Sequence, residues 1–180
     1  LTDLDSRAGD GDLGASMLRG AQAVRGLPDT AWANPAHAFV SIGNALRRAI
    51  AGSSGPFYAI ALTRAGRHLA GDPDFAPETF IEALEIAVAA ISQIGGARPG
   101  DRTMLDALHP ALEAARAAAG SDPKSAWRAA AKAAEDGARA TETMSPKLGR
   151  AAYLGDRAVG VPDGGAAAVA IWMRALAEAL

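Results

Sequence analysis

The sequence predicts an all-α protein with its helices arranged up and down, and three observations support this prediction. Hydrophobic residues make up 49% of the chain and aromatic residues only 5%, with alanine the main apolar residue. Alanine is the strongest helix former, so this composition favours closely packed helices. Apolar residues recur at helical spacing in successive stretches, none of which reads as a convincing strand. The connections between these stretches are short, which favours antiparallel neighbours.

About seven helices are expected, separated by breaks rich in glycine and proline. In chain order they run from Asp12 to Gly26, through Phe39 to Ile50, from Pro56 to Leu69, from Pro77 through Ile91, through Leu105 to Leu112, from about Lys124 to Thr143, and from Asp163 through Leu176. The chain also begins at Leu1 inside what reads as the end of a helix. No fixed-period repeat or linker is found, so residues 1–180 are interpreted as one domain.

Capping residues support these helix ends. Asp12 and Asp163 each stand where an N-cap is expected, with a side chain that accepts a hydrogen bond from a free backbone N–H. Asp101 or Thr103 is expected to cap the helix through Leu105 to Leu112. A long irregular segment is expected over residues 145–162, where three glycines interrupt the pattern.

Composition and charge exclude several classes of function. The formal net charge is −2, so no basic surface for nucleic acid is indicated. The chain has no cysteine, which excludes disulfides, thiolate catalysis and cysteine-ligated zinc, and its three scattered histidines argue against a histidine metal site. No apolar run of about 18 residues is free of charges and helix breakers, and no signal peptide is recognised. We therefore expect no membrane partner and a cytoplasmic location.

A stretch rich in glycine and aspartate near the N-terminus predicts the functional site. Asp5, Asp10 and Asp12 follow one another closely there. Gly9 and Gly11 lie between them, so the backbone can adopt positive φ and fold tightly. Three carboxylates that converge on one point would offer the hard oxygen ligands that Mg²⁺ or Ca²⁺ prefers.

Two familiar motifs do not fit this stretch. Gly9, Gly11 and Gly14 have the spacing of the dinucleotide-binding fingerprint, but no apolar strand precedes them and two aspartates lie inside the loop. An EF-hand loop counted from Asp10 has Ala15 in place of the glycine and Ala21 in place of the bidentate glutamate. The remaining alternative is a surface turn without a ligand, since Asp-Gly pairs are common in turns.

Glycine-rich breaks recur at alternate helix ends, over residues 9–14, 52–55, 95–100 and 160–165. Alternate connections of an up-and-down bundle lie at the same end, so these loops are expected to gather around the aspartates. Helix N-termini attract phosphate through their free N–H groups and their dipole. Ser53 and Ser54 add hydroxyl donors, and Arg150 adds a fixed positive charge. Together these features predict a polyphosphate site.

The charges of such a site require a metal. ATP carries about −4 and the three aspartates about −3, so their repulsion costs several kcal/mol at an effective dielectric near 20. Two divalent cations would offset most of this repulsion. Nucleotide and metal are therefore expected to bind together.

Five ordered motifs resemble those of the nucleotide-binding subunit of dihydroxyacetone kinases, and the resemblance covers essentially the whole chain. The first motif joins Leu4-Asp5 to Gly9-Asp10-Gly11-Asp12 and Gly14. The others are Gly52-Ser53-Ser54-Gly55-Pro56, Pro99-Gly100-Asp101-Arg102-Thr103-Met104-Leu105-Asp106, Gly149-Arg150-Ala151-Ala152-Tyr153-Leu154-Gly155 and Asp163-Gly164-Gly165-Ala166.

The resemblance implies an antiparallel barrel of eight helices with Mg–nucleotide bound at one end. Asp5, Asp10 and Asp12 would hold two Mg²⁺ that bridge the phosphates of ATP or ADP. The family pattern further implies nucleotide contacts from Leu13, Gly14, Ala15, Ser16, Ser53 and Ser54 at the phosphates, Gly95 and Met104 at the adenine, Arg150 at a phosphate, and Asp163, Gly164 and Gly165 at a closing loop.

Three departures from the family pattern are present. Position 13 usually holds His or Cys, and Leu13 lacks their polar atoms. Gly164 replaces a proline, which loosens the loop, although Asp163 retains the cap. The first helix of the family would precede Leu1, so an open seam with exposed apolar surface is expected in the barrel.

The resemblance implies a kinase component that transfers a phosphoryl group without a catalytic base of its own. A separate substrate-binding kinase domain or subunit would hold a dihydroxyacetone-like hydroxyketone or sugar. Positioning and charge neutralisation by the metal would supply the catalysis. A homodimer is left open.

Three alternatives remain at this point. A phosphotransferase-linked relative would keep ADP permanently bound and be recharged by a phosphocarrier protein. A nucleotide domain of the fatty acid kinase type would transfer the phosphoryl group to a carboxylate. A non-catalytic binding module would only sense the state of a partner.

Overall fold

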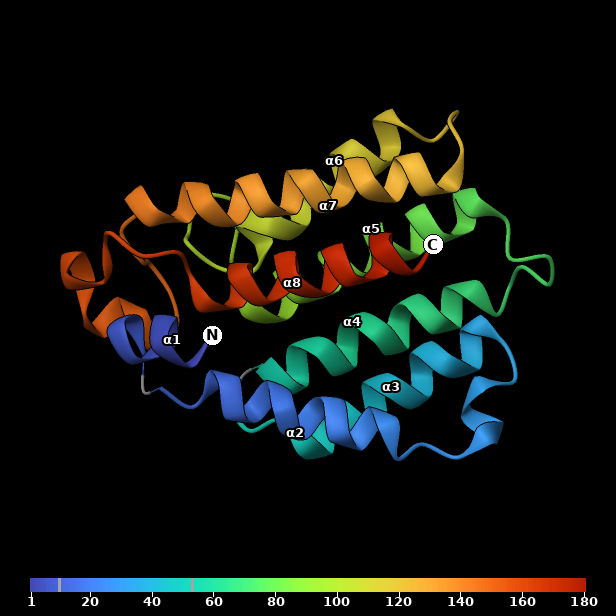
Figure 1. Cartoon of the computed structure of the whole chain (residues 1–180), viewed down its shortest axis with the longest axis horizontal. Coiled ribbons are helices and arrows are strands. Elements are labelled where there is room, and N and C mark those ends of the chain that lie inside the picture. The colour runs from blue at the N-terminus through green and yellow to red at the C-terminus, as the bar shows by residue number, and fades with distance from the viewer. Residues whose placement is uncertain (10, 53) are drawn as a thin grey trace. The chain divides into compact units, whose positions relative to one another are not determined.

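The computed structural model describes residues 1–9, 11–52 and 54–180, and Figure 1 shows their arrangement into helices. Within these residues there are eight α-helices, four short 3-10 turns and no strand, which confirms the all-α prediction. The α-helices are α1 (Thr2–Ala8), α2 (Leu13–Arg25), α3 (Pro35–Ala49), α4 (Ser54–Leu69), α5 (Pro77–Gly95), α6 (Leu105–Ala117), α7 (Pro123–Ala140) and α8 (Gly164–Ala179). The 3-10 turns are η1 (Asp29–Trp32), η2 (Thr141–Thr143), η3 (Arg150–Tyr153) and η4 (Gly155–Ala158).

The structure differs from the sequence prediction mainly at the connections. The helix expected to reach Thr143 ends as an α-helix at Ala140, because the chain tightens there into the 3-10 turn η2. The segment expected to be irregular over residues 145–162 contains η3 and η4. No helix of the described residues is both long and apolar enough to cross a bilayer.

The described chain divides into two compact units. The first comprises Leu1–Gly14 and Ala97–Leu180, and the second comprises Ala15–Gly96. Each unit has its own tightly packed helices, so each presents its own part of the predicted site.

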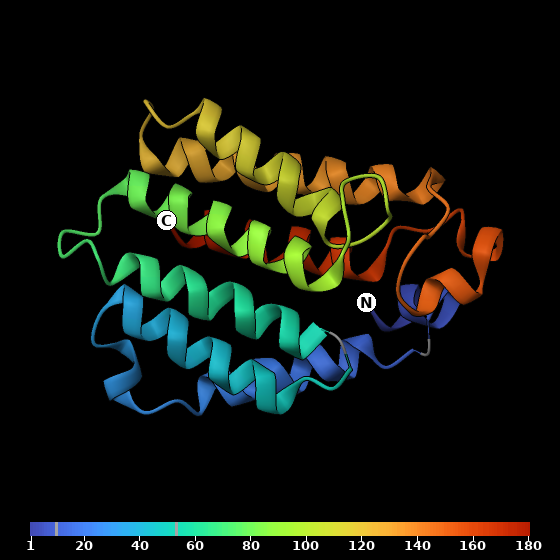
Figure 2. The same ribbon diagram turned by 180° about the vertical axis from the view of Figure 1, so that it is seen from behind.

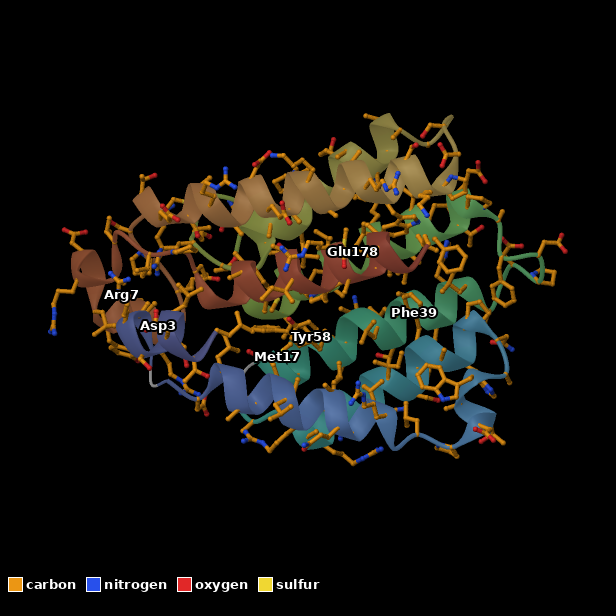
Figure 3. The ribbon with its side chains drawn as sticks, in the orientation of Figure 1. Asp3, Arg7, Met17, Phe39, Tyr58 and Glu178 are labelled. Atoms are coloured by element: carbon orange, nitrogen blue, oxygen red, sulfur yellow. The ribbon has the colours of Figure 1, made fainter. Side chains whose placement is uncertain are left out.

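In the second unit, α3, α4 and α5 pack against one another through small residues (Figure 2). A Cβ added to Gly66 of α4 would lie 2.8 Å from the carbonyl oxygen of Ala36, near the start of α3. The end of α4 therefore meets the start of α3, as an antiparallel pair requires. Phe39, labelled in Figure 3, lies with its ring centroid 6.4 Å from that of Phe80 on α5 and packs on the core around Leu69.

In the first unit, α6, α7 and α8 form the main helical layer (Figure 1). Gly137 of α7 lies directly against the backbone carbonyl of Asp106 at the start of α6, where no Cβ would fit. An ion pair of 3.6 Å between Arg174 and Glu135 joins α8 to α7. The core between these helices is rich in alanine, which allows close approach, and its fully buried members include Ala107, Ala111, Ala130, Ala134 and Ala166.

Candidate functional site

Asp5 links α1 to the start of α2. Its Oδ2 accepts a hydrogen bond of 3.0 Å from the backbone N–H of Leu13, the first residue of α2. The other carboxylate oxygen lies against Gly9, where any Cβ would collide with it. Glycine at position 9 is therefore required for this carboxylate position, and the side chain of Asp5 is half-buried and held in one direction.

The remaining acidic residues of this stretch are placed differently. Asp12 is exposed and immediately precedes α2, while Asp3 and Arg7, labelled on α1 in Figure 3, are exposed as well. Asp10 lies outside the described residues. In the part of the chain that the structure describes, no group of three potential metal-ligating side chains occurs. Convergence of the predicted trio, which includes Asp10, remains a prediction.

The first unit brings several predicted nucleotide-site residues together around the starts of α2 and α8. A Cβ added to Gly164 would lie 2.8 Å from the Cδ2 atom of Leu13. A Cβ added to Gly165 would lie 3.5 Å from the Cβ of Met104, which precedes α6 and is 8% exposed. With the Asp5–Leu13 hydrogen bond, these contacts connect four separate elements in one region.

Asp163 caps α8 as the sequence predicts. Its Oδ1 accepts a hydrogen bond of 2.8 Å from the backbone N–H of Ala166. Its own backbone N–H donates to the Oγ1 of the buried Thr141 at 2.7 Å. Burial raises the pKa of the Asp163 carboxyl, while the Ala166 N–H and then the charge of Arg102 act in the opposite direction. Asp163 therefore lies half-buried at the N-terminus of the helix that it caps.

The second unit places its predicted residues at neighbouring helix ends. Ser16 of α2 is buried, and its Oγ accepts a hydrogen bond of 2.7 Å from Nη2 of Arg19. Arg19 also donates from Nε to the carbonyl oxygen of Ala49, the last residue of α3, at 3.4 Å. Ser54 begins α4 and is half-buried. Ser53 lies outside the described residues.

Gly95 ends α5 beside the first turn of α4. A Cβ added there would lie 3.2 Å from the ring of Phe57. Gly55, next to Ser54, lies against the carbonyl of Ile50, so the end of α3 also meets the start of α4. The remaining predicted residues of the two units are Gly14 in the first turn of α2, Ala15, which is exposed, and Arg150, which is exposed at the start of η3.

The capping prediction for α6 was wrong, because the N-cap of this helix is Met104, which makes no side-chain cap hydrogen bond. Asp101 does not cap α6: its Oδ2 accepts from the backbone N–H of Arg98, and its Oδ1 pairs with Lys147 at 3.0 Å. The hydrogen bond from Lys147 lowers the pKa of Asp101. Thr103 does accept a hydrogen bond from the N–H of Leu105, at 3.2 Å. The turn before α6 is held by the carboxylate of Asp106, which accepts hydrogen bonds from two of its backbone N–H groups.

Sequence reasoning missed two buried charged residues in this turn. Asp106 accepts hydrogen bonds from the backbone N–H groups of Gly100 and Thr103. Arg102 is 1% exposed and donates to three backbone carbonyls. Both lie in the motif from Pro99 to Asp106, in which the sequence analysis gave a role only to Met104. The available signal was the presence of two charged residues between a glycine turn and an apolar helix.

The arrangement suits an anionic ligand with a hard cation. Carboxylate oxygens such as those of Asp5 and Asp12 are the donors that Mg²⁺ prefers. In the first unit, the starts of α2 and α8 offer backbone N–H groups of the kind that suits phosphate. These donors and the Asp5 carboxylate are the chemical groups that a metal-bound phosphate would require.

Comparison with known proteins identifies the family. A model of the DAK2 domain matches residues 7–178. The chain is 39% identical to the D-erythrulose kinase of Mycolicibacterium smegmatis, over 99% of this chain and 32% of that protein. It is 33% identical to the ADP-binding subunit DhaL of the PEP-dependent dihydroxyacetone kinase of Escherichia coli, over 99% of this chain and 87% of that subunit.

A solved structure shares the fold. The dihydroxyacetone kinase of C. freundii in complex with AMP-PNP and Mg²⁺ matches with a TM-score of 0.76 and 34% identity, over 99% of this chain and 30% of that one. The chain thus spans about a third of the length of these larger kinases. It belongs to the DAK2 domain family, the nucleotide-binding domain of dihydroxyacetone-type kinases.

Proposed function

We propose that this chain binds ATP or ADP together with two Mg²⁺ and presents a phosphoryl group to a hydroxyketone held by a separate domain or subunit. The observation that carries this proposal is the fixed carboxylate of Asp5, which lies between a required glycine and the first N–H of α2. A relative of the same fold is solved with AMP-PNP and Mg²⁺, which supports the proposed ligands.

Each residue group of the chain has a defined part in this proposal. Asp5, Asp10 and Asp12 hold the metal, which when bound neutralises charge on the phosphoryl oxygens. The starts of α2 and α4, with Ser16 and Ser54, bind the phosphates through N–H and hydroxyl donors. Held in this way, the phosphoryl group needs positioning more than a base.

The remaining assignments complete the nucleotide site. Gly95 and Met104 border the adenine. Arg150 binds a phosphate as a fixed cation. Asp163, Gly164 and Gly165 close the site at the start of α8. An antiparallel barrel formed by the whole chain, and a cytoplasmic location, belong to the same proposal.

The proposal predicts that nucleotide affinity depends on Mg²⁺. Without the metal, carboxylates and phosphates repel one another, so Mg-free ATP or ADP should bind about a hundredfold more weakly. Titration calorimetry with Mg²⁺ and with EDTA measures this difference. The variant Asp10→Asn should reduce the Mg²⁺ effect about tenfold or more, because it removes one metal ligand.

The matched control is Asp3→Asn, which removes an exposed aspartate of the same helix as Asp5. It should leave affinity and Mg²⁺ dependence unchanged. Equal affinity with and without Mg²⁺ in the unsubstituted chain would remove the metal assignment. Failure to bind any nucleotide would favour the binding-module alternative, and ADP that survives purification would favour the phosphocarrier-linked one.

A further inference from the structure

Arg102 is buried and its backbone is left-handed. Its exposed fraction is 1% and its φ is 61°. A positive φ is uncommon for a residue other than glycine, and arginine is rarely fully buried unless it is paired. Both features are unfavourable by themselves, so the position is determined by what the side chain binds.

The turn around Arg102 is fixed on both sides by one carboxylate. Asp106, itself 6% exposed, accepts a hydrogen bond of 2.7 Å from the N–H of Thr103. Its other oxygen accepts from the N–H of Gly100. The two donors flank Arg102 in the sequence, so these hydrogen bonds fix the backbone of the turn and with it the direction of the Arg102 side chain.

The guanidinium of Arg102 binds residues 141–161, here called the connecting segment, at both ends. Nε donates to the carbonyl oxygen of Thr141 at 3.2 Å. Nη2 donates to the carbonyl oxygens of Ala158 at 2.7 Å and Val161 at 2.9 Å. The Arg102 side chain therefore joins the beginning of the connecting segment to its end, beside a direct backbone hydrogen bond of 2.8 Å from the N–H of Gly160 to the carbonyl oxygen of Glu142.

The connecting segment and α1 share an apolar cluster that includes two of the residues bound by Arg102. The cluster consists of Ala8, Ala158 and Val161, with Leu4, Ala151 and Leu154 packed against it. Leu4 and Ala8 lie on either side of Asp5 on α1, and Ala151 follows Arg150. Two of the three carbonyls that Arg102 binds, those of Ala158 and Val161, thus belong to the apolar cluster that also includes residues of α1 and η3.

Stability alone does not account for Arg102. Its third nitrogen, Nη1, is buried and has no hydrogen-bond partner within the described chain. A buried cation with an unused donor commonly stabilises a folded protein less than a well-packed apolar side chain would. The turn also binds the connecting segment at Lys147, whose backbone N–H and ammonium group both donate to Asp101. The ammonium group is largely exposed, and exposed ion pairs contribute little.

We propose that Arg102 is a positioning residue of the nucleotide site. By joining the two ends of the connecting segment, it holds Arg150 on that segment and Asp5 on α1 in the positions that phosphate and metal require. This inference rests on the proposed nucleotide-binding function and adds a residue that touches no ligand itself.

The variant Arg102→Gly, with and without added guanidinium ion, tests this proposal. Glycine tolerates the positive φ, so the turn should survive while the guanidinium is removed. We expect the affinity for Mg–AMP-PNP to fall about tenfold, the scale seen when residues that orient a metal ligand are lost. Amides of residues 145–158 should exchange faster, with α6 and α7 unchanged. Millimolar guanidinium should restore both, and equal sodium chloride should not.

The matched control is Arg98→Gly, which removes an exposed arginine of the same turn and should change neither readout. Unchanged affinity and exchange in Arg102→Gly would overturn the proposal. A uniform rise in exchange across all helices, without rescue by guanidinium, would also overturn it, because that pattern indicates a purely structural role.

If Arg102→Gly does not fold, Arg102→Lys takes its place. Lysine keeps the charge but cannot donate to three separated carbonyls. We therefore expect a smaller loss of affinity and a smaller increase in amide exchange than in Arg102→Gly. Wild-type behaviour of Arg102→Lys would contradict the proposal. If the unsubstituted chain binds no Mg–AMP-PNP, the proposed function fails, whereas exchange in the connecting segment and its rescue still test Arg102.

Discussion

At the residue scale, the two positions that depart from the family pattern lie in contact. Leu13 stands where His or Cys is usual, and Gly164 stands where proline is usual. The Cδ2 atom of Leu13 would lie 2.8 Å from any Cβ at position 164. The Leu13 side chain therefore fills the space into which a side chain at position 164 would extend.

This contact predicts coupling between the two positions. Gly164→Ala should destabilise the chain while Leu13 is present and be tolerated when combined with Leu13→Ala. The interaction energy should be about 0.5–3 kcal/mol, as for residues in direct contact. Urea unfolding of the two single variants and the double variant measures it.

The adjacent glycine provides the control for this cycle. A Cβ at Gly165 would approach Asp163 and Met104 and not Leu13. A cycle of Gly165→Ala with Leu13→Ala should therefore be additive. Strict additivity in the Leu13–Gly164 cycle would show that the two departures are independent.

At the element scale, helix separation in the first unit depends on glycine. Gly137 of α7 faces the carbonyl of Asp106, and a Cβ at this position has no room. Asp106 is also the residue that holds the turn before α6. The α6–α7 contact therefore supports the turn that carries Met104 and Arg102.

Gly137→Ala decides between two opposing effects. Helix propensity alone would stabilise α7 by about 1 kcal/mol. Collision with a backbone carbonyl cannot be relieved by a rotamer change and should destabilise by about 1–3 kcal/mol. We expect the collision to dominate, with net destabilisation in urea unfolding.

Gly120, in the turn before α7, is the matched control because nothing lies within 4 Å of an added Cβ. Gly120→Ala should change the free energy of unfolding by about 0.5 kcal/mol or less. A stabilised Gly137→Ala variant would mean that α6 and α7 can separate without loss.

At the scale of the whole molecule, the chain belongs to a nucleotide-binding domain family, and the proposal places no phosphoryl acceptor among its described residues. The larger kinases it resembles are about three times its length, and it covers 87% of an ADP-binding subunit. We infer that the acceptor is held elsewhere, by a separate domain or subunit.

The isolated chain should therefore bind Mg–ATP without phosphorylating dihydroxyacetone. The physical reason is that transfer requires the hydroxyl to be held in line with the phosphoryl group, and a free ketose is not so held. Coupled detection of dihydroxyacetone phosphate, with nucleotide binding measured on the same preparation, tests this expectation. Product formed by the chain alone would place the acceptor site within it.

Part of the fold was predictable from the sequence because local physics determines it. Alanine content and apolar spacing predicted the helices, and Asp163 caps α8 because an aspartate before a helix binds its free N–H groups. The capping of α6 was not predictable in full, since Asp101 and Asp106 compete for neighbouring N–H groups. Only the folded turn shows that Asp106 holds them.

The sequence by itself determined the helical class, the acidic glycine stretch and the ordered motifs, because each depends on residues close together in the chain. Only the tertiary structure decided which carbonyls Arg102 binds and that Leu13 meets Gly164. These facts depend on contacts between residues 39 to 59 positions apart for Arg102, and between the starts of two helices for Leu13. Such contacts follow from packing of the whole unit, which no local pattern specifies.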